Sequence, residues 1–316
     1  MIVEFSGDST GGPPLKFMNF SRKSAPAVVR IGCVFGDNCF DVTKAIGDDL
    51  LEFPRVVFTL EEVLQVKDGL ETLEDRLRGL ERSSSGIQSY LYDLSTIDFH
   101  PPVIRPLKLI GIGLNYKDHA EEVKLPAPKQ PLIFGMYSNA IVAHGERIVI
   151  PPMSKQVDYE AELAVVIGRK ARNVSTQKAL EFVGGYTIIN DVSARDLQFS
   201  DGQWLRAKSF DTFAPMGPFL VTRDDLGDAG SLAIEMRLNG RTMQKSNTRN
   251  LIFKVPDLVS YLSEVMTLEV GDVIATGTPA GVGFVRNPQV FMRPGDIAEI
   301  EIEGIGVLSN PVVASD

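Results

Sequence analysis

A proline-rich segment, Pro101-Pro-Val-Ile-Arg-Pro106, most constrains how this chain can fold. Three prolines in six residues exclude a helix, because each ring removes a backbone N–H donor and disfavours the helical conformation of the residue before it. We therefore expect an extended linker there. The chain has 316 residues, enough for about two domains of roughly 150 residues each. We predict a small N-terminal domain at 1–104 and a larger domain at 105–316.

The N-terminal domain is predicted to be small and α+β, after a loose end at 1–14. Short β runs at 16–20 and 27–35 are joined by a turn. A helix begins after Thr59, where a glutamate three residues on completes a capping box, and Ser83-Ser-Ser-Gly86 ends it. Apolar residues recur along this helix at three- and four-residue steps, with a possible break at Asp68-Gly69: Leu60, Val63, Leu64, Leu70, Leu73, Leu77 and Leu80.

The larger domain is predicted to be strand-dominated, which makes the whole chain α+β. The dipeptide Asn239-Gly240 indicates a tight hairpin. Helices are expected only at 176–183 and at 256–266, where a proline occupies the first turn. Short β runs supply the rest: Leu109–Gly113, Glu160–Gly168, Tyr186–Asn190, Ile234–Leu238, Val273–Thr276 and Ile297–Ile302.

Charge and composition exclude several classes of partner and location. The net charge is −9 and no stripe of Lys and Arg is present, which argues against nucleic acid and anionic membranes as partners. No apolar run approaches the roughly 20 residues of a membrane span, and the first residues lack the features of a secretory signal. Cys33 and Cys39 are six residues apart and fit neither a metal motif nor a disulfide framework. We expect an intracellular protein, cytoplasmic or in the mitochondrial matrix and not secreted, with two reduced, structural cysteines.

Two glycine-rich segments resemble nucleotide-binding loops but lack the defining residues. Gly111-Ile-Gly113 has Tyr116 where a third glycine belongs, and 277–283 lacks the Gly-Lys-Ser/Thr of a phosphate loop. We interpret both as tight turns at strand ends. A threonine and backbone amides at such a turn can still bind a substrate carboxylate.

Glu160 and Glu162 share one face of a predicted strand, because side chains two residues apart on a strand point the same way. Such a pair is weak evidence by itself, since 299–303 repeats the same spacing in strict alternation, as on a solvated sheet face. The first pair differs because it leads into Leu163-Ala-Val-Val-Ile167, which is apolar on both faces and typical of a fully buried strand. Carboxylates at such a position need a partner.

Asp191 ends the next apolar strand and supplies a third carboxylate. Two glutamates and an aspartate form an all-oxygen site suited to Mg²⁺, with Mn²⁺ or Ca²⁺ as substitutes. Zinc is disfavoured because neither Cys nor His lies near these runs.

The sequence contains three histidines, and His119 is the one with a possible catalytic partner. In a helical turn, Glu122 at position i+3 would face His119 and orient its imidazole as a general base toward water. The alternative is an ordinary capping or surface pair. His100 is expected in the linker, and His144 is expected at the surface in a polar turn.

Five motifs, taken together and in this order, resemble the fumarylacetoacetate hydrolase superfamily. They cover most of residues 105–313, whereas the first hundred residues match only loosely. The motifs are Gly111–Glu122, Asp158–Gly168, Asn190–Gln198, Gln203–Thr212 and Gly271–Gly283.

The resemblance implies a mixed β-roll catalytic domain and a homodimer. It also implies a divalent cation held by Glu160, Glu162 and Asp191, and it places His119 and Glu122 on a lid loop that orders with substrate. Lys208 would act as a charge partner for the substrate. The remaining matched positions would contact substrate: Arg195, Gln198 and Thr278.

The chemistry implied by the resemblance is the formation of a metal-bound enolate from a 2-oxo acid. The first expectation is enol–keto tautomerisation of oxaloacetate. Cleavage of a C–C bond in acylpyruvates or fumarylacetoacetate-like diketo acids, and decarboxylation of oxaloacetate, are alternatives. A metal-stabilised binding protein without turnover is a further alternative, which intact His119, Glu122 and Lys208 argue against.

Overall fold

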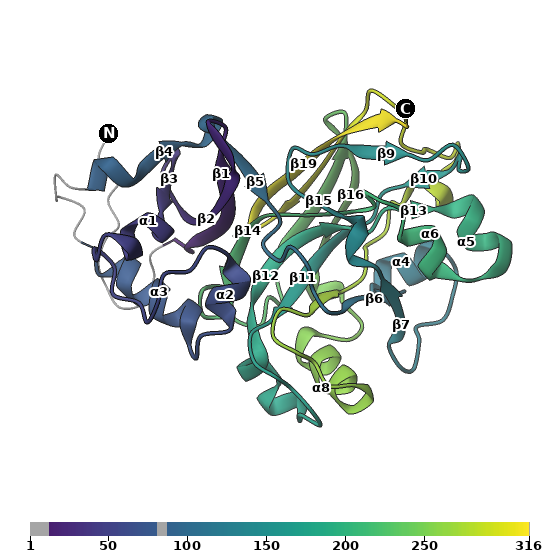
Figure 1. Ribbon diagram of the computed structural model, residues 1–316. Coiled ribbons are helices and arrows are strands. Elements are labelled where there is room, and N and C mark those ends of the chain that lie inside the picture. The colour runs from purple at the N-terminus through teal and green to yellow at the C-terminus, as the bar shows by residue number, and fades with distance from the viewer. Residues whose placement is uncertain (1–12, 81–86, 316) are drawn as a thin grey trace.

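The computed structural model describes residues 13–80 and 87–315. The fold is α+β and dominated by strands, as predicted. Most of the expected loose end at 1–14, and all of the helix terminator at 83–86, lie outside the described residues. Figure 1 shows the N-terminal elements on one side and the strand-rich remainder on the other.

One large mixed sheet connects the two parts of the chain. β1 pairs with β14 across the predicted boundary, in the register Phe17 opposite Leu220. In spatial order the sheet contains β4 (Leu91–Asp93), β3 (Asn38–Asp41), β2 (Ala25–Phe35), β1 (Lys16–Arg22), β14 (Ala214–Thr222), β12 (Val183–Asn190), β11 (Ala161–Ile167), β17 (Val273–Ala275), β6 (Leu109–Gly113) and β7 (Leu132–Met136), with β5 (Ile97–His100) beside β1 and β8 (Ile141–Val142) beside β14.

Two smaller sheets and several short helices complete the fold. The smaller sheets are β16 (Arg241–Asn247), β15 (Ala233–Leu238), β18 (Ile297–Ile302), β19 (Gly306–Ala314) and β9 (Ile148–Ile150), and separately β10 (Val157–Asp158) with β13 (Ser193–Ala194). The α-helices are α1 (Val42–Gly47), α2 (Leu60–Leu64), α3 (Gly69–Arg78), α4 (Lys117–Glu122), α5 (Arg195–Asp201), α6 (Trp204–Lys208), α7 (Arg223–Leu226) and α8 (Val255–Val265). Figure 1 shows α1 to α3 around the N-terminal strands and α4 to α6 together near β6 and β7.

Most predicted strands are confirmed, but the expectation of only two helices in the larger domain is wrong, because the short helices α5, α6 and α7 have too few residues to show a helical period in the sequence. The leucine-rich helix is two helices, because Asp68 adopts a left-handed conformation with φ of 54° between α2 and α3. Thr59 caps α2 by accepting a hydrogen bond from the Glu62 amide. The helix expected at 176–183 is a 3-10 helix, Thr176–Phe182. Asn239-Gly240 forms the predicted two-residue hairpin turn with positive φ at both residues.

β11 is an interior strand of the large sheet, paired with β12 on one edge and β17 on the other. All seven of its residues are buried, so both of its faces are covered. The prediction of a fully buried strand at this position is confirmed. By contrast, Glu299 and Glu301 on β18 alternate with buried isoleucines and face solvent, as their spacing predicts.

Gly111 lies inside β6, so its interpretation as a turn residue is wrong, whereas Gly113 ends the strand and a turn follows at Leu114 with φ of 50°. A Cβ at Gly111 would overlap the ring of Phe134, and one at Gly113 would overlap the ring of Trp204. These glycines therefore make room for two aromatic rings next to the strand.

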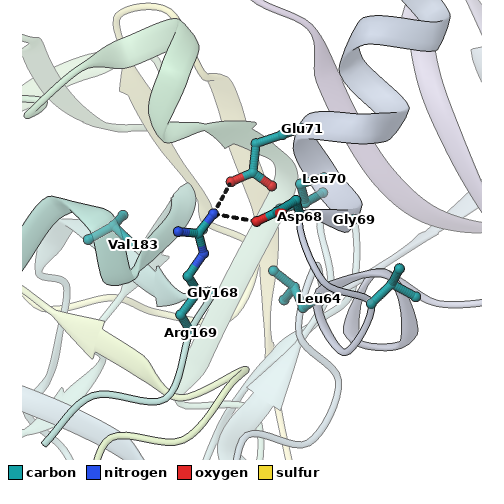
Figure 2. A pocket seen from close by; sticks show the side chains of 10 residues that line it. Leu64, Asp68, Gly69, Leu70, Glu71, Gly168, Arg169 and Val183 are labelled. Atoms are coloured by element: carbon teal, nitrogen blue, oxygen red, sulfur yellow. Dashed lines mark hydrogen bonds and ion pairs between the residues drawn. The ribbon is translucent and has the colours of Figure 1, made fainter.

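The proline-rich segment bends at 102–105, so the prediction of an extended linker is wrong, and it is tied to the N-terminal elements. The Asn19 side chain donates to the carbonyls of Pro101 and Pro102 at 3.0 and 3.2 Å, and its oxygen accepts from the Leu60 amide at 2.8 Å. A second connection is ionic: Arg169 lies 2.6 Å from Asp68 and 3.4 Å from Glu71. Figure 2 shows the Arg169 side chain pointing toward both carboxylates. Both carboxylates belong to the start of α3, so this side chain ties the N-terminal helices to the end of β11.

The histidines outside the site are more enclosed than predicted. His144 is half-buried, with Nδ1 accepting from the Ser309 amide at 3.1 Å and its ring 5.0 Å from that of Phe99, so the surface prediction is wrong. His100 closes β5 and its Nε2 lies 3.0 Å from Ser21 Oγ. The loop carrying His144 packs against β5 and β19, which its polar sequence does not reveal.

Cys33 and Cys39 are buried and free, in agreement with a structural role. Among the described residues, no helix has both the length and the apolar character needed to cross a membrane.

Candidate active site

Three carboxylates gather at the end of β11, where it pairs with β12. Glu160 precedes β11, Glu162 lies within it, and Asp191 directly follows β12. The strand register brings them together, because the Asp191 amide donates to the Glu160 carbonyl at 3.0 Å. Their oxygens lie within 4.8 Å of one another, and all three side chains are buried.

Two buried cations contact this cluster. Lys208 Nζ lies 2.8 Å from Glu160, 2.6 Å from Asp191 and 2.8 Å from the Ser193 hydroxyl. Arg195 pairs with Glu160 at 2.7 Å and, through Nε, with Asp158 at 2.9 Å. These two cations therefore pair with three carboxylates, Glu160, Asp191 and Asp158, and neither pairs with Glu162.

The pKa values reflect this uneven distribution of charge. Burial raises the pKa of Glu162 well above its usual value, and the neighbouring carboxylates of Asp191 and Glu160 raise it further. Burial also raises the pKa of Asp191, to about 7, against the opposing effect of Lys208. Burial acts the same way on Glu160, but Lys208 and Arg195 outweigh it and hold its pKa at about 2.

The cluster is short of positive charge and has free ligand capacity. Asp191 Oδ1 is buried and accepts no hydrogen bond from the protein. A bare buried carboxylate is costly, and a divalent cation is the usual compensation when several oxygens converge. The residues present therefore fit a hard divalent cation with oxygen ligands.

His119 and Glu122 form the predicted pair on α4. His119 Nδ1 lies 3.1 Å from Glu122 Oε2, and the Gly281 amide donates to both Glu122 oxygens at 2.9 and 3.1 Å. Because Glu122 accepts, the imidazole proton is placed on Nδ1 and Nε2 is left as the basic nitrogen. His119 is buried and lines the same cavity as the carboxylates.

The glycine-rich segment 277–284 donates backbone amides to three different carboxylates. Gly277 N donates to Glu162 at 2.7 Å, and Gly283 N donates to Asp158 at 2.7 Å. With the Gly281 amide on Glu122, one stretch of backbone holds all three acids. These three amides are therefore engaged by the protein's own carboxylates, and contact of Thr278 with a substrate carboxylate stays a prediction.

We expect Gly281→Ala to lower activity sharply and to cost about 2–4 kcal/mol of unfolding free energy. Gly281 has φ of +106°, and an added Cβ would overlap the Met243 carbonyl, so the amide that holds Glu122 must move. Gly295→Ala is the matched control: its φ is +96°, but nothing lies within 4 Å of the added Cβ. Denaturant unfolding and steady-state rates measure the difference, and equal losses in both variants would contradict this account.

The predicted site residues converge on one cavity of about 370 Å³. Glu122 lies behind His119, and Asp191 contacts Lys208. Seven predicted residues line the cavity directly: His119, Glu160, Glu162, Arg195, Gln198, Lys208 and Thr278. Arg195 Nη1 donates to Gln198 Oε1 at 2.9 Å, and Thr278 Oγ1 accepts from Gln244 at 2.8 Å.

Sequence reasoning missed two groups of residues at the site. Asp158 is fully buried and accepts from Arg195 and from the 283–284 amides, yet only its place in the Asp-Tyr-Glu motif hinted at a role. The other group is aromatic and lines the outer part of the cavity: Phe134, Phe199, Trp204 and Phe284. No local pattern marked these rings, because they come from four separate segments.

Comparisons with known proteins identify the family of this chain. The family model "Fumarylacetoacetate (FAA) hydrolase C-terminal" matches residues 108–313. The rat protein named "Oxaloacetate tautomerase Fahd2a, mitochondrial" is 46% identical over 233 residues, which are 73% of this chain and 74% of the rat protein.

Solved structures support the same relationship over nearly the whole chain. A fumarylacetoacetate hydrolase from the psychrophile Exiguobacterium antarcticum is 35% identical, with a TM-score of 0.78 over 95% of this chain and 100% of its own. A 5-carboxymethyl-2-hydroxymuconate delta-isomerase from Mycobacterium smegmatis is 34% identical, with a TM-score of 0.71 over 95% and 99%. The chain belongs to the fumarylacetoacetate hydrolase family and is an enzyme of that type.

Proposed function

We propose that this enzyme catalyses enol–keto exchange of a 2-oxo acid, with oxaloacetate as the first substrate to test. The observation that carries the proposal is the buried trio of carboxylates beside Lys208, open to a cavity that also contains His119. The similar rat protein is named an oxaloacetate tautomerase, which supports the choice of substrate.

Glu160, Glu162 and Asp191 are proposed to hold Mg²⁺, with Mn²⁺ or Ca²⁺ as substitutes, because all their donors are carboxylate oxygens. A cation bound there would supply a Lewis acid that favours negative charge on the keto oxygen of a 2-oxo acid. The unpartnered Asp191 Oδ1 is the donor most available to it.

Two buried cations of the chain are proposed to have different roles. Lys208 Nζ, fixed by three oxygens at 2.6–2.8 Å, places a second positive charge next to the developing enolate. Arg195 holds Glu160 in place from the other side through its 2.7 Å ion pair. Lys208 and Glu160 are buried, which strengthens both electrostatic effects because charges interact more strongly inside a protein than in water.

Hydrolysis of a C–C bond in an acylpyruvate is a second candidate, and the His119–Glu122 pair favours it. His119 lines the cavity, and its Nδ1 is fixed by Glu122 at 3.1 Å, so Nε2 is the nitrogen left to act on a bound water. An imidazole held in this way can take a proton from a water that attacks a distal carbonyl. Enol–keto exchange needs no such water.

The decisive experiment measures rates on enol-oxaloacetate, keto-oxaloacetate and acetylpyruvate side by side with Mg²⁺ present. Enol-to-keto conversion well above the buffer rate supports tautomerisation, whereas pyruvate release from acetylpyruvate supports hydrolysis. Decarboxylation is followed as CO₂ from the keto form. Rates at background on all three substrates would overturn the proposal.

We propose that the enzyme works as a twofold homodimer, the commonest closed oligomer. Light scattering at micromolar concentration is expected to give twice the 34.6 kDa mass of one chain. A mass near that of a single chain across the micromolar range would contradict this prediction.

We further propose an intracellular location, in the mitochondrial matrix or the cytoplasm. The support is the word "mitochondrial" in the names of several similar proteins. Fractionation of the source cells with an antibody to the chain tests it, and recovery from the culture medium alone would overturn it.

A further inference from the structure

The cavity of the site has a polar inner end and an apolar outer part. The carboxylates, Lys208 and Arg195 form the inner end. Most of the outer lining is aromatic or aliphatic: Leu125, Leu132, Phe134, Phe199, Trp204 and Phe284. A cavity of about 370 Å³ lies within the roughly 300–1,000 Å³ that holds drug-sized ligands, so a small dicarboxylate would leave the outer part unfilled.

The aromatic lining consists of two ring pairs, and each touches one of the buried cations. Phe134 and Trp204 stack edge to face with centroids 5.3 Å apart, and Lys208 Nζ lies 5.0 Å from the Phe134 centroid. On the other side, Phe199 and Phe284 lie 5.3 Å apart, and the Arg195 guanidinium is 4.5 Å from the Phe284 centroid. The apolar walls therefore begin where the polar site ends, with no intervening layer.

The backbone of β6 is adapted to one of these pairs. A Cβ at Gly111 or Gly113 would overlap the Phe134 or Trp204 ring, so the two glycines allow both rings to lie directly against the strand. The absence of a side chain at these two positions of β6 thus leaves space for two rings that line the cavity.

No basic side chain in the described lining is free to bind a second carboxylate. Lys208 is held by Glu160 and Asp191, and Arg195 is held by Asp158 and Glu160. The remaining basic residue of the lining, His119, is paired with Glu122. A carboxylate at the distal end of a substrate would therefore lose water without gaining an ion pair, which is unfavourable.

The mouth of the cavity exposes apolar surface. Phe199 is 62% exposed and Leu125 is 55% exposed. An apolar group bound in the outer cavity would remove part of this surface from water and gain roughly 0.8 kcal/mol, or a factor of about four, per buried methylene.

We propose that the outer cavity is a subsite for an apolar distal group. Among 2-oxo acids longer than oxaloacetate, it makes those with an alkyl or aryl tail better substrates than the dicarboxylates of the same length. Phe199 and Trp204 determine this specificity. The inference rests on the proposed function, since it concerns which 2-oxo acids are enolised at the site.

The test measures exchange of C3 protons for deuterium in D₂O by NMR, with the buffer rate subtracted. In this exchange a C3 proton leaves to a base and a deuteron from solvent replaces it. The substrates are pyruvate, 2-oxobutanoate, 2-oxopentanoate and 2-oxohexanoate, with 2-oxoadipate as the six-carbon dicarboxylate. We expect kcat/KM to rise about fourfold per methylene and to fall at least about tenfold from 2-oxohexanoate to 2-oxoadipate.

Substitutions of Phe199 at the mouth of the cavity test whether this residue determines the preference for apolar tails. Phe199→Ala should lower the 2-oxohexanoate to pyruvate ratio of kcat/KM by about tenfold, whereas Phe199→Arg should raise the ratio of 2-oxoadipate to 2-oxohexanoate. Phe58→Ala is the matched control: this phenylalanine is 47% exposed but lies outside the cavity lining, and both ratios should be unchanged.

Trp204 is the chain's single tryptophan, so its fluorescence reports binding directly. Hexanoate is expected to change the Trp204 emission with a Kd about tenfold lower than that of adipate, a dicarboxylate of the same carbon number. This measurement does not depend on turnover.

The outcomes distinguish failure of the proposed function from failure of the proposed subsite. Exchange at the buffer rate with every substrate overturns the proposed function. Exchange that is flat or falling with chain length, together with equal Kd values for hexanoate and adipate, overturns the subsite alone. A Phe199→Ala variant that changes the mass in light scattering and leaves the ratios unchanged would assign Phe199 to a contact between copies and also overturn the subsite.

Discussion

Glu162→Gln is expected to remove Mg²⁺-dependent turnover, by more than about 100-fold, while leaving the fold intact. Loss of a residue that only orients a metal ligand costs about 10–100-fold, so loss of a ligand should exceed that range. The amide oxygen of glutamine can still accept from Gly277 N at the position that Glu162 now occupies. Steady-state rates with and without Mg²⁺ measure the effect.

Thermal unfolding gives a second readout for the same variant. A ligand that binds the folded state raises the melting temperature, so the Mg²⁺-dependent rise should disappear in Glu162→Gln. Glu301→Gln is the matched control, since Glu301 has the same Glu-x-Glu spacing but faces solvent on β18. Full activity of the native enzyme in excess chelator would contradict the metal assignment.

His119→Ala is expected to eliminate C–C cleavage, with a loss of roughly two to four decades for removal of one general base. Enol–keto exchange should fall less, because the cation and Lys208, rather than the imidazole, favour charge on the keto oxygen. Lys208→Ala should reduce both reactions. Parallel assays on acetylpyruvate and oxaloacetate measure the division of roles.

Glu122→Gln is a conservative variant that tests whether the charge of Glu122 supports the action of His119. The amide retains an oxygen near the Gly281 amide but provides no charge to stabilise an imidazolium, so cleavage should fall while exchange changes little. If His119→Ala lowers exchange as deeply as cleavage, then His119 moves the enol proton itself and the proposed division is wrong.

The sequence predicted the polar part of the site well, for physical reasons. Glu160 and Glu162 stood out because charge interrupted an otherwise apolar strand, and Asp191 stood out because it ended the next one. His119 and Glu122 followed from helical spacing, which the structure confirms. Each of these signals is local, and local patterns are visible in a single sequence.

The parts that the sequence did not reveal depend on distant contacts. Gly111 resembled a turn residue because the ring that needs its space, Phe134, lies 20 or more residues away. The amides of 277–284 resembled a ligand site because their partners, among them Glu122 and Asp158, lie more than 100 residues earlier. His144 resembled a surface residue because β19, which covers it, comes from the other end of the chain.

Because backbone N–H groups of 277–284 hold the acids of the site, most side-chain substitutions in this segment do not remove these hydrogen bonds. Substitution of the side chain at the partly exposed Ala280 leaves every N–H in place, so we expect it to have little effect on the acids that this stretch holds. A proline is the exception, because it deletes the donor itself. Vulnerability is thus concentrated at Gly277, Gly281 and Gly283, where an added Cβ would displace the donor. We therefore expect substitution of these glycines, which have no reactive side chain, to impair the enzyme as substitution of its acids does.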